Sequence, residues 1–147
     1  MSLVLRTIII WLGLLSCAHA AEIAGVVKTL QGEARIDRSG MSLEAQVGIP
    51  VHAGDRIRVG KTGSIGISMR DETLISLGPN SDLVIDGYAY NPTTREGKVE
   101  TSILKGTLRY VTGLIAKLNP GAVKVTTPTA TVGIRGTDFI VEVPDEK

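Results

Sequence analysis

Residues 64–77 read SIGISMRDETLISL and contain two short stretches of alternating character. In the first stretch, apolar residues stand at positions 65, 67 and 69, so an extended backbone places all three on one face. Asp71 and Glu72 separate this stretch from the second, and we interpret them as solvated turn residues. The whole stretch therefore predicts two short β-strands joined by a tight turn.

Similar segments lie on both sides of this stretch, with turn signals about every 8–12 residues, as in all-β domains. Residues 23–30 and 34–37 predict an opening hairpin, and residues 99–104 and 107–111 predict another. A helical turn is expected only at residues 113–118. We expect one compact all-β domain of short antiparallel strands and hairpins, either a β-sandwich or a β-roll or β-helix-like fold, with little or no helix after residue 20.

The N-terminal residues have the pattern of a secretory signal peptide. Arg6 precedes an apolar run at residues 8–15, and the small-x-small sequence Ala18-His19-Ala20 follows. The apolar run is too short to span a bilayer stably. We predict a signal peptide at residues 1–20, cleavage after Ala20 and a periplasmic domain at residues 21–147.

Cys17 offers an alternative fate for the N-terminus. The sequence Leu14-Leu15-Ser16-Cys17 resembles a bacterial lipobox, in which the cysteine is acylated and becomes the first residue. Leu15 is larger than the residue usually found there, so cleavage after Ala20 is favoured over a lipoprotein.

Cleavage after Ala20 changes the composition of the working chain. Residues 21–147 contain fifteen basic and fifteen acidic side chains, no cysteine, no tryptophan and one histidine, His52. This composition excludes disulfides and thiol chemistry and argues against a closed zinc site and against nucleic-acid binding. We interpret His52 as a surface loop residue and predict no catalytic residues, metal or cofactor.

Two groups of side chains are candidates for a recognition surface. Arg56 and Arg58 share one face of a predicted strand and could hold an anion, although a solvated strand face is the simpler interpretation. Tyr88 and Tyr90 precede residues 91–97, a polar stretch that predicts a projecting hairpin tip. The tyrosines could form a contact surface, but a packing pair is favoured.

Three segments of the chain carry recognisable motifs, namely VHAGDRIRVG at residues 51–60, TLISLGPNSDL at 73–83 and VTTPTATVGIRGTDF at 125–139. Together they resemble the FecR domain family. Val59 stands where the family more often has threonine. The segments occur in the family's order, and the motif-bearing part of the chain is residues 51–143.

The motif residues indicate structural roles. Turn formation accounts for the glycines, prolines and short polar side chains, and a core position is expected for the only phenylalanine. Gly136 is expected to allow a bend or a close approach of the backbone. The motif residues are Gly54, Asp55, Pro79, Asn80, Ser81, Pro128, Arg135, Gly136, Thr137 and Phe139.

The resemblance implies signalling or binding in the periplasm. Full-length relatives pass an iron-siderophore signal from an outer-membrane receptor to a cytoplasmic sigma factor. With a cleavable signal peptide and no cytoplasmic segment, we expect no direct sigma-factor contact and no membrane anchor after cleavage. We predict a non-enzymatic module with a periplasmic or outer-membrane protein partner and leave its oligomeric state open. The alternative is a domain that binds a cell-wall glycan or an anion through Arg56, Arg58 and the two tyrosines.

We predict a free edge for the last predicted strand, residues 137–143. Many relatives continue with further strands, so Ile140, Val141 and Val143 could lie on a strand with a free edge. Pro144 and the charged residues after it are typical of a guard against edge-to-edge pairing. We expect this edge either to be covered by the opening hairpin or to accept a strand from a partner.

Overall fold

The computed structural model describes residues 21–145 and confirms a single all-β domain. The predicted signal peptide lies outside the described residues. Within the described residues, helix is confined to the short α1 (Leu114–Leu118), where a helical turn was predicted, and to the 3-10 turn η2 (Pro120–Ala122). The strands are β1 (Ile23–Gln31), β2 (Ala34–Arg38), β3 (Met41–Glu44), β4 (Pro50–His52), β5 (Arg56–Val59), β6 (Ser64–Met69), β7 (Leu74–Leu77), β8 (Asp82–Tyr90), β9 (Gly97–Val111), β10 (Val123–Thr126), β11 (Thr131–Gly133) and β12 (Asp138–Val143).

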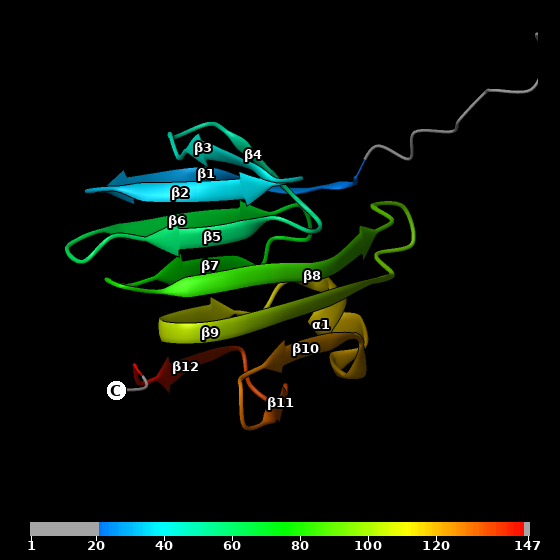
Figure 1. Ribbon diagram of the computed structural model, residues 1–147. Helices are drawn as coiled ribbons and strands as arrows, with labels where there is room; N and C mark the ends of the chain where they lie inside the picture. The colour runs from blue at the N-terminus through cyan, green and yellow to red at the C-terminus, as the bar shows by residue number, and fades with distance from the viewer. Residues whose placement is uncertain (1–20, 146–147) are drawn as a thin grey trace, which may run out of the picture.

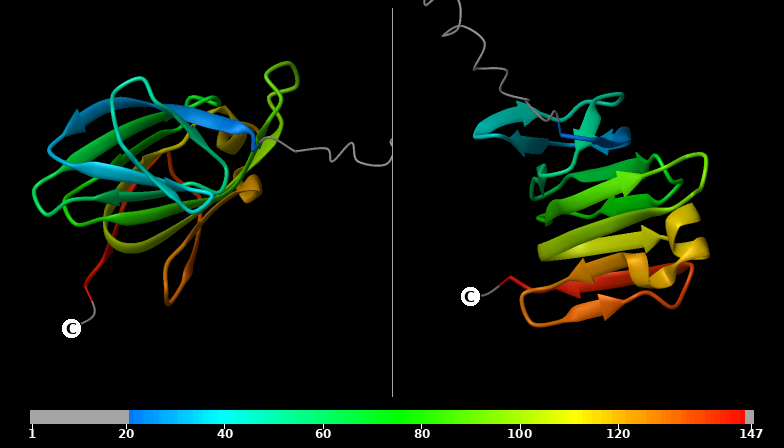
Figure 2. Two further views of the ribbon diagram at one scale, coloured as in Figure 1. Left: turned by 45° about the horizontal axis from the view of Figure 1, so that its top comes forward. Right: turned by 90° about the vertical axis from the view of Figure 1, so that its right-hand side faces the viewer.

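The strands form one curled sheet whose two halves face each other like the layers of a sandwich (Figures 1 and 2). One half has the order β4-β1-β6-β7-β9-β12, and the other has the order β3-β2-β5-β8-β9-β10-β11. All strand pairs are antiparallel except β9 with β10, which run parallel. Strand β9 belongs to both halves and joins them.

The long strand β9 replaces the hairpin predicted at its centre. Its first part pairs with β8 and β10, and its second part pairs with β7 and β12. Gly106 lies at the change of partner with a φ of 90°, and a Cβ atom there would overlap Ser81. The glycine thus bends a continuous strand from one half into the other instead of reversing the chain.

The opening hairpin prediction was also wrong, for a related reason. Strand β1 pairs with β4 and β6, whereas β2 pairs with β3 and β5 in the opposite half. Gly32, with a φ of 65°, turns the chain from one half to the other. The hairpins between β2 and β3, β6 and β7, and β10 and β11 do form, as does the projecting tip between β8 and β9.

The core fills the space between the two halves. Inward positions of the central strands hold fully buried Ile, Leu and Val side chains, among them Ile67, Ile75, Leu83 and Leu108. Burying one such side chain stabilises the fold by roughly 1.5–3 kcal/mol. The alternation of residues 64–77 thus has the predicted consequence, since Ile65, Ile67 and Met69 all face this core.

The two ends of the stack differ. At the closed end, residues 45–49 cross from β3 to β4 over the top of the core, and Gly48 and Ile49 exchange backbone hydrogen bonds with Val27 at 2.9 and 3.0 Å. At the open end, the halves stop at β11 and β12 (Figure 1). Among residues 21–145, no helix is long and apolar enough to cross a membrane.

Candidate functional site

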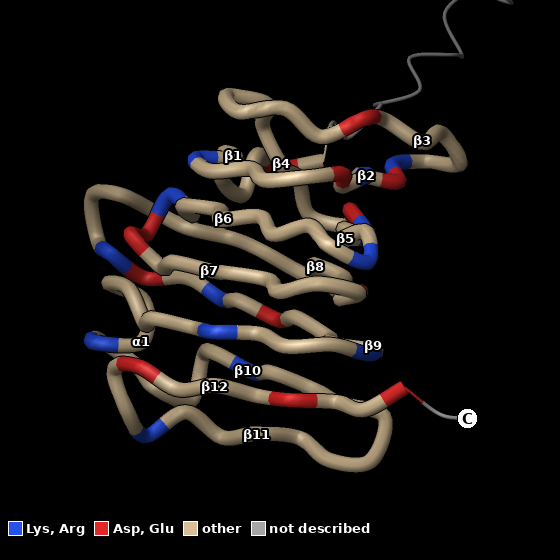
Figure 3. The backbone as a smooth tube through the Cα atoms, turned by 90° about the vertical axis from the view of Figure 1, so that its left-hand side faces the viewer, with Lys and Arg blue, Asp and Glu red and all other residues tan. Residues whose placement is uncertain are grey.

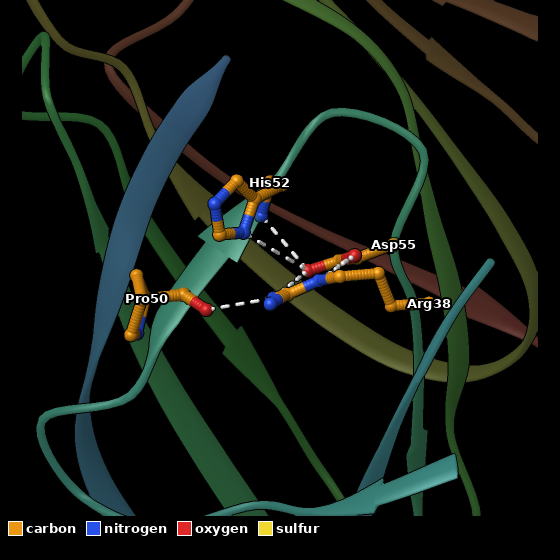
Figure 4. A network of polar contacts seen from close by, with 4 residues as sticks. All are labelled: Arg38, Pro50, His52 and Asp55. Atoms are coloured by element: carbon orange, nitrogen blue, oxygen red, sulfur yellow. Dashed lines mark hydrogen bonds and ion pairs between the residues drawn. The ribbon is translucent and has the colours of Figure 1, made fainter. Parts of the chain in front are cut away.

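A connected polar cluster is centred on Asp55, at the closed end (Figure 4). The Arg38 guanidinium donates from Nε and Nη2 to the two carboxylate oxygens of Asp55 at 2.8 and 2.7 Å. It also donates from Nη2 to the Pro50 carbonyl at 2.9 Å, and the His52 backbone N–H donates to Asp55 at 2.8 Å. Since Arg38 ends β2, Asp55 precedes β5 and Pro50 begins β4, the cluster ties the two halves together.

Gly54 and Asp55 act as their motif predicts. Gly54 has a φ of 91°, which a glycine adopts without strain. The loop is fixed to β8, because the Gly54 N–H donates to the Ile85 carbonyl at 2.7 Å and the Ile85 N–H to the Asp55 carbonyl at 2.9 Å. The Asp55 carboxylate, fully buried, is therefore a structural anchor.

His52 is not the surface loop residue that we predicted. It ends β4, its side chain is 18% exposed, and its Nδ1 lies 4.0 Å from an Asp55 oxygen. Arg38 was not predicted from the sequence. Its guanidinium binds both carboxylate oxygens of Asp55, and the His52 ring lies farther from this carboxylate than the guanidinium does. No serine, threonine or cysteine side chain donates a hydrogen bond to His52 within residues 21–145, so the cluster lacks the geometry of a nucleophile and its base.

Asp71 is buried, contrary to the prediction of a solvated turn. Its carboxylate accepts a hydrogen bond from Thr73 Oγ1 at 2.8 Å, and its backbone N–H donates to the Tyr88 hydroxyl at 3.1 Å. Thr73 Oγ1 in turn accepts the Gly113 N–H at 3.1 Å, which positions the start of α1. The buried Asp71 carboxylate therefore holds the turn between β6 and β7 in place.

The predicted interaction residues on β5 and β8 do not form a common open surface. Arg56 forms an ion pair with Asp82, and Arg58 forms one with Asp37 at 2.7 Å. Tyr88 is buried, and this burial raises the pKa of its hydroxyl, so the ring is not available for a surface contact. Tyr90 is partly buried and packs against the core.

Ser81 and Asn80 stabilise the connection between β7 and β8. The Ser81 hydroxyl accepts the Thr107 N–H at 2.9 Å and donates to the Thr107 carbonyl at 3.2 Å. Asn80, after Pro79, has a φ of 57°, a conformation that asparagine tolerates better than most residues. These motif residues thus fix the connection against the bend of β9.

The third motif forms the open end. Pro128 lies in the β10–β11 turn, and exposed Arg135 and Gly136 connect β11 to β12. Of the two roles expected for Gly136, the bend is present, whereas the close approach is absent, because within the described chain a Cβ atom there would meet no atom within 4 Å. Phe139 is half-buried at the margin of the core and stacks on Tyr110 with a ring-centroid distance of 5.3 Å.

Strand β12 has one partner within residues 21–145, namely β9. β1 and β2, which were predicted to form the opening hairpin, lie toward the closed end and do not pair with β12, so the expectation that they cover it was wrong. Val141 and Val143 face the core, while Ile140 is 67% exposed on the outer face. Next to this strand lies a groove of about 540 Å³, formed by the bend of β9, the β10–β11 turn and the end of β12; its lining includes Leu104, Lys105, Pro128, Glu142, Val143 and Pro144.

These features define a class of protein: a small all-β domain whose motif residues hold turns, sheet connections and one open sheet end. The chain belongs to the FecR family, because the family model described as FecR protein matches residues 55–147. This is a family of regulatory signalling domains that are generally associated with the cell envelope. No curated protein and no solved structure matches the chain.

Proposed function

We propose that the chain is an exported, non-enzymatic interaction module of envelope signalling, and that it contacts its protein partner through the free edge of β12. Family membership supports the signalling role. The observation that carries the interaction role is the unpaired edge of β12, beside a groove and flanked by half-buried apolar side chains.

The ion pairs of the described arginines favour a contact through the sheet edge over an anion site. Arg38, Arg56 and Arg58 are each occupied by a carboxylate of the same chain. An anion would have to displace these carboxylates, which weakens the alternative of a glycan or anion site on β5. A free sheet edge, in contrast, offers a row of backbone donors and acceptors that another chain can use.

The experiment places a photo-crosslinking amino acid at position 140 of the full chain in envelope-containing cells. We expect crosslinks to an envelope protein from this position. In a second pair of proteins the crosslinker is at position 142, and Ile140→Asp is expected to reduce the crosslinks relative to the same protein with Ile140. A crosslinker at position 44, on the edge of β3 at the closed end, is the matched control. Equal crosslinking from positions 44 and 140, or recovery of the chain only in the cytoplasmic fraction, would contradict the proposal.

A further inference from the structure

The two halves of the sheet have unequal lengths at the open end. Beyond β9, one half continues with β10 and β11, whereas the other continues with β12 within the described chain. β10 and β12 follow the two parts of β9, so β11 extends one strand further than the opposite half (Figure 1). Val132 of β11 is half-buried and packs against the core, and within residues 21–145 the opposite half ends at β12, one strand earlier.

The backbone of β12 has groups available at this vacant position. The Thr112 N–H donates to the Thr137 carbonyl at 2.9 Å, so the backbone groups of Thr137 point toward β9. Successive residues of a strand direct their N–H and C=O groups to opposite sides. The groups of Asp138, Ile140 and Glu142 therefore point to the free edge.

The side chains of β12 form two different faces. Phe139, Val141 and Val143 point inward and are half-buried, so an added strand would cover them with apolar side chains of its own. Asp138, Ile140 and Glu142 point outward and are exposed. An added strand must therefore have apolar residues at its inward positions. Its outward positions must place basic or neutral residues beside the two acidic side chains and an apolar residue beside Ile140.

The charges of the outer row disfavour a second copy of β12 as the added strand. In antiparallel self-pairing centred on Ile140, Asp138 would lie opposite Glu142 of the copy, and like charges in directly opposite positions are destabilising. In the register centred on Val141, which overlaps equally far, Glu142 would lie opposite Ile140 and diagonally to Glu142 of the copy, so it would still gain no opposite charge. Arg109 pairs with Asp138 at 2.6 Å, whereas Glu142 has no ion-pair partner within residues 21–145. β12 carries no basic residue and β11 carries no charge (Figure 3).

From this geometry we infer that the free edge of β12 accepts an extended segment of a partner protein that is apolar on its inward side and basic on its outward side. A lysine or arginine of the segment lies opposite Glu142, and an apolar residue lies opposite Ile140. The segment completes the shorter half of the sheet and packs on Val132 from across the core. This inference rests on the proposed function and specifies the chemistry of the partner.

The probe is a fluorescently labelled nine-residue peptide, Thr-Val-Lys-Val-Ile-Val-Lys-Val-Thr, at nanomolar concentration. Its outward residues read the same in both directions, so the test does not depend on strand orientation. The comparison peptide has glutamate in place of both lysines. Fluorescence anisotropy with the domain at low salt is expected to show at least tenfold tighter binding of the lysine peptide, and the difference should shrink as salt screens the charges.

Two variants locate the site. Glu142→Lys is expected to reverse the preference, so that the glutamate peptide binds more tightly. Ile140→Pro removes an edge N–H that β9 does not use and is expected to abolish binding of both peptides. The matched control is Glu44→Pro on the edge of β3. The Ala45 N–H donates to the Ala34 carbonyl of the neighbouring chain segment, so the N–H of Glu44 points outward, as that of Ile140 does. This variant should bind the lysine peptide like the wild type.

The outcomes separate the inference from the proposed function. Equal binding of both peptides, lost in Ile140→Pro, would overturn the charge selectivity while leaving β12 as a docking edge. Binding that survives in a folded Ile140→Pro variant, with folding checked by circular dichroism, would remove the docking edge as well. Self-association of the domain that Ile140→Pro disrupts would overturn the inference in favour of a second copy.

Discussion

The closed and open ends of the stack use the same kind of ion pair in different surroundings. Arg38 and Asp55 join the two halves through a bidentate contact in which the carboxylate is fully buried. Arg109 and Asp138 make a bidentate contact within one half, at the surface. The buried pair therefore holds the two halves together at the closed end. The exposed pair at the open end joins β12 only to its neighbour β9.

The core is less completely buried at the open end than in the middle of the stack. Around the middle of the stack, side chains such as Leu108 are fully buried, whereas Val141, its neighbour on β12, is only half-buried. A half-buried apolar residue contributes less to folding and leaves apolar area for a partner to cover. The open end is thus the part of the domain in which stability and binding can be separated.

The largest effect is expected from truncation of the core. Leu108→Ala should lower the free energy of unfolding by about 3 kcal/mol, because it removes buried methyl groups and leaves a cavity. Val141→Ala, next to it in the register, should cost about 1 kcal/mol, since solvent already reaches that site. Urea unfolding measures both, and equal costs would show that the open end is as well packed as the centre.

An effect of similar size is expected from the buried ion pair. Asp55→Ala should cost about 3 kcal/mol, because it leaves Arg38 without its carboxylate and removes the acceptor of the His52 N–H. Asp138→Ala, the matched change at the open end, should leave the urea midpoint close to that of the wild type, because water solvates both partners there. If the two variants had equal midpoints, the contrast between the ends would be lost.

The smallest effect concerns pH. Hydrogen bonds from Ser42 and Arg58 lower the pKa of Asp37 below its ordinary value of 3.8. A lowered pKa in the folded state stabilises the fold above the ordinary value, and this stabilisation is lost as the pH falls through the folded pKa. Asp37→Asn should therefore cost less than about 1 kcal/mol at pH 7 and progressively less as the pH falls below 3.8.

Urea midpoints of the wild type and Asp37→Asn across this pH range test the expectation. A difference between the two proteins that grows as the pH falls would contradict it, because the sign of the linkage would then be reversed.

The sequence predicts the strands well and their partners poorly. Alternation at residues 64–77 identifies inward side chains because it depends on local backbone geometry. Gly32 and Gly106 were each assigned to hairpins, yet they carry the chain between the two halves. Glycine signals a change of direction, but which strand lies next is decided by long-range packing.

The candidate site shows the same division between local and distant information. Gly54, Asp55, Asn80 and Ser81 hold turns and connections, as their residue types indicate. Arg38 went unnoticed because it lies seventeen residues before the carboxylate that it binds. Tyr88 and Asp71 are buried against each other for a similar reason. The free edge of β12 was anticipated, but β11 as the strand that makes the two halves unequal was not.

Amide hydrogen exchange of β12, measured residue by residue by NMR with and without the lysine peptide, tests the central claim most directly. In the free monomer, the amides of Asp138, Ile140 and Glu142 are expected to exchange fast and that of Val141 slowly, because only the last points toward β9. With the peptide bound, the amides of Ile140 and Glu142 should become protected. Slow exchange at all four residues in the free monomer, or no gain in protection on binding, would contradict the account of β12 as a free docking edge.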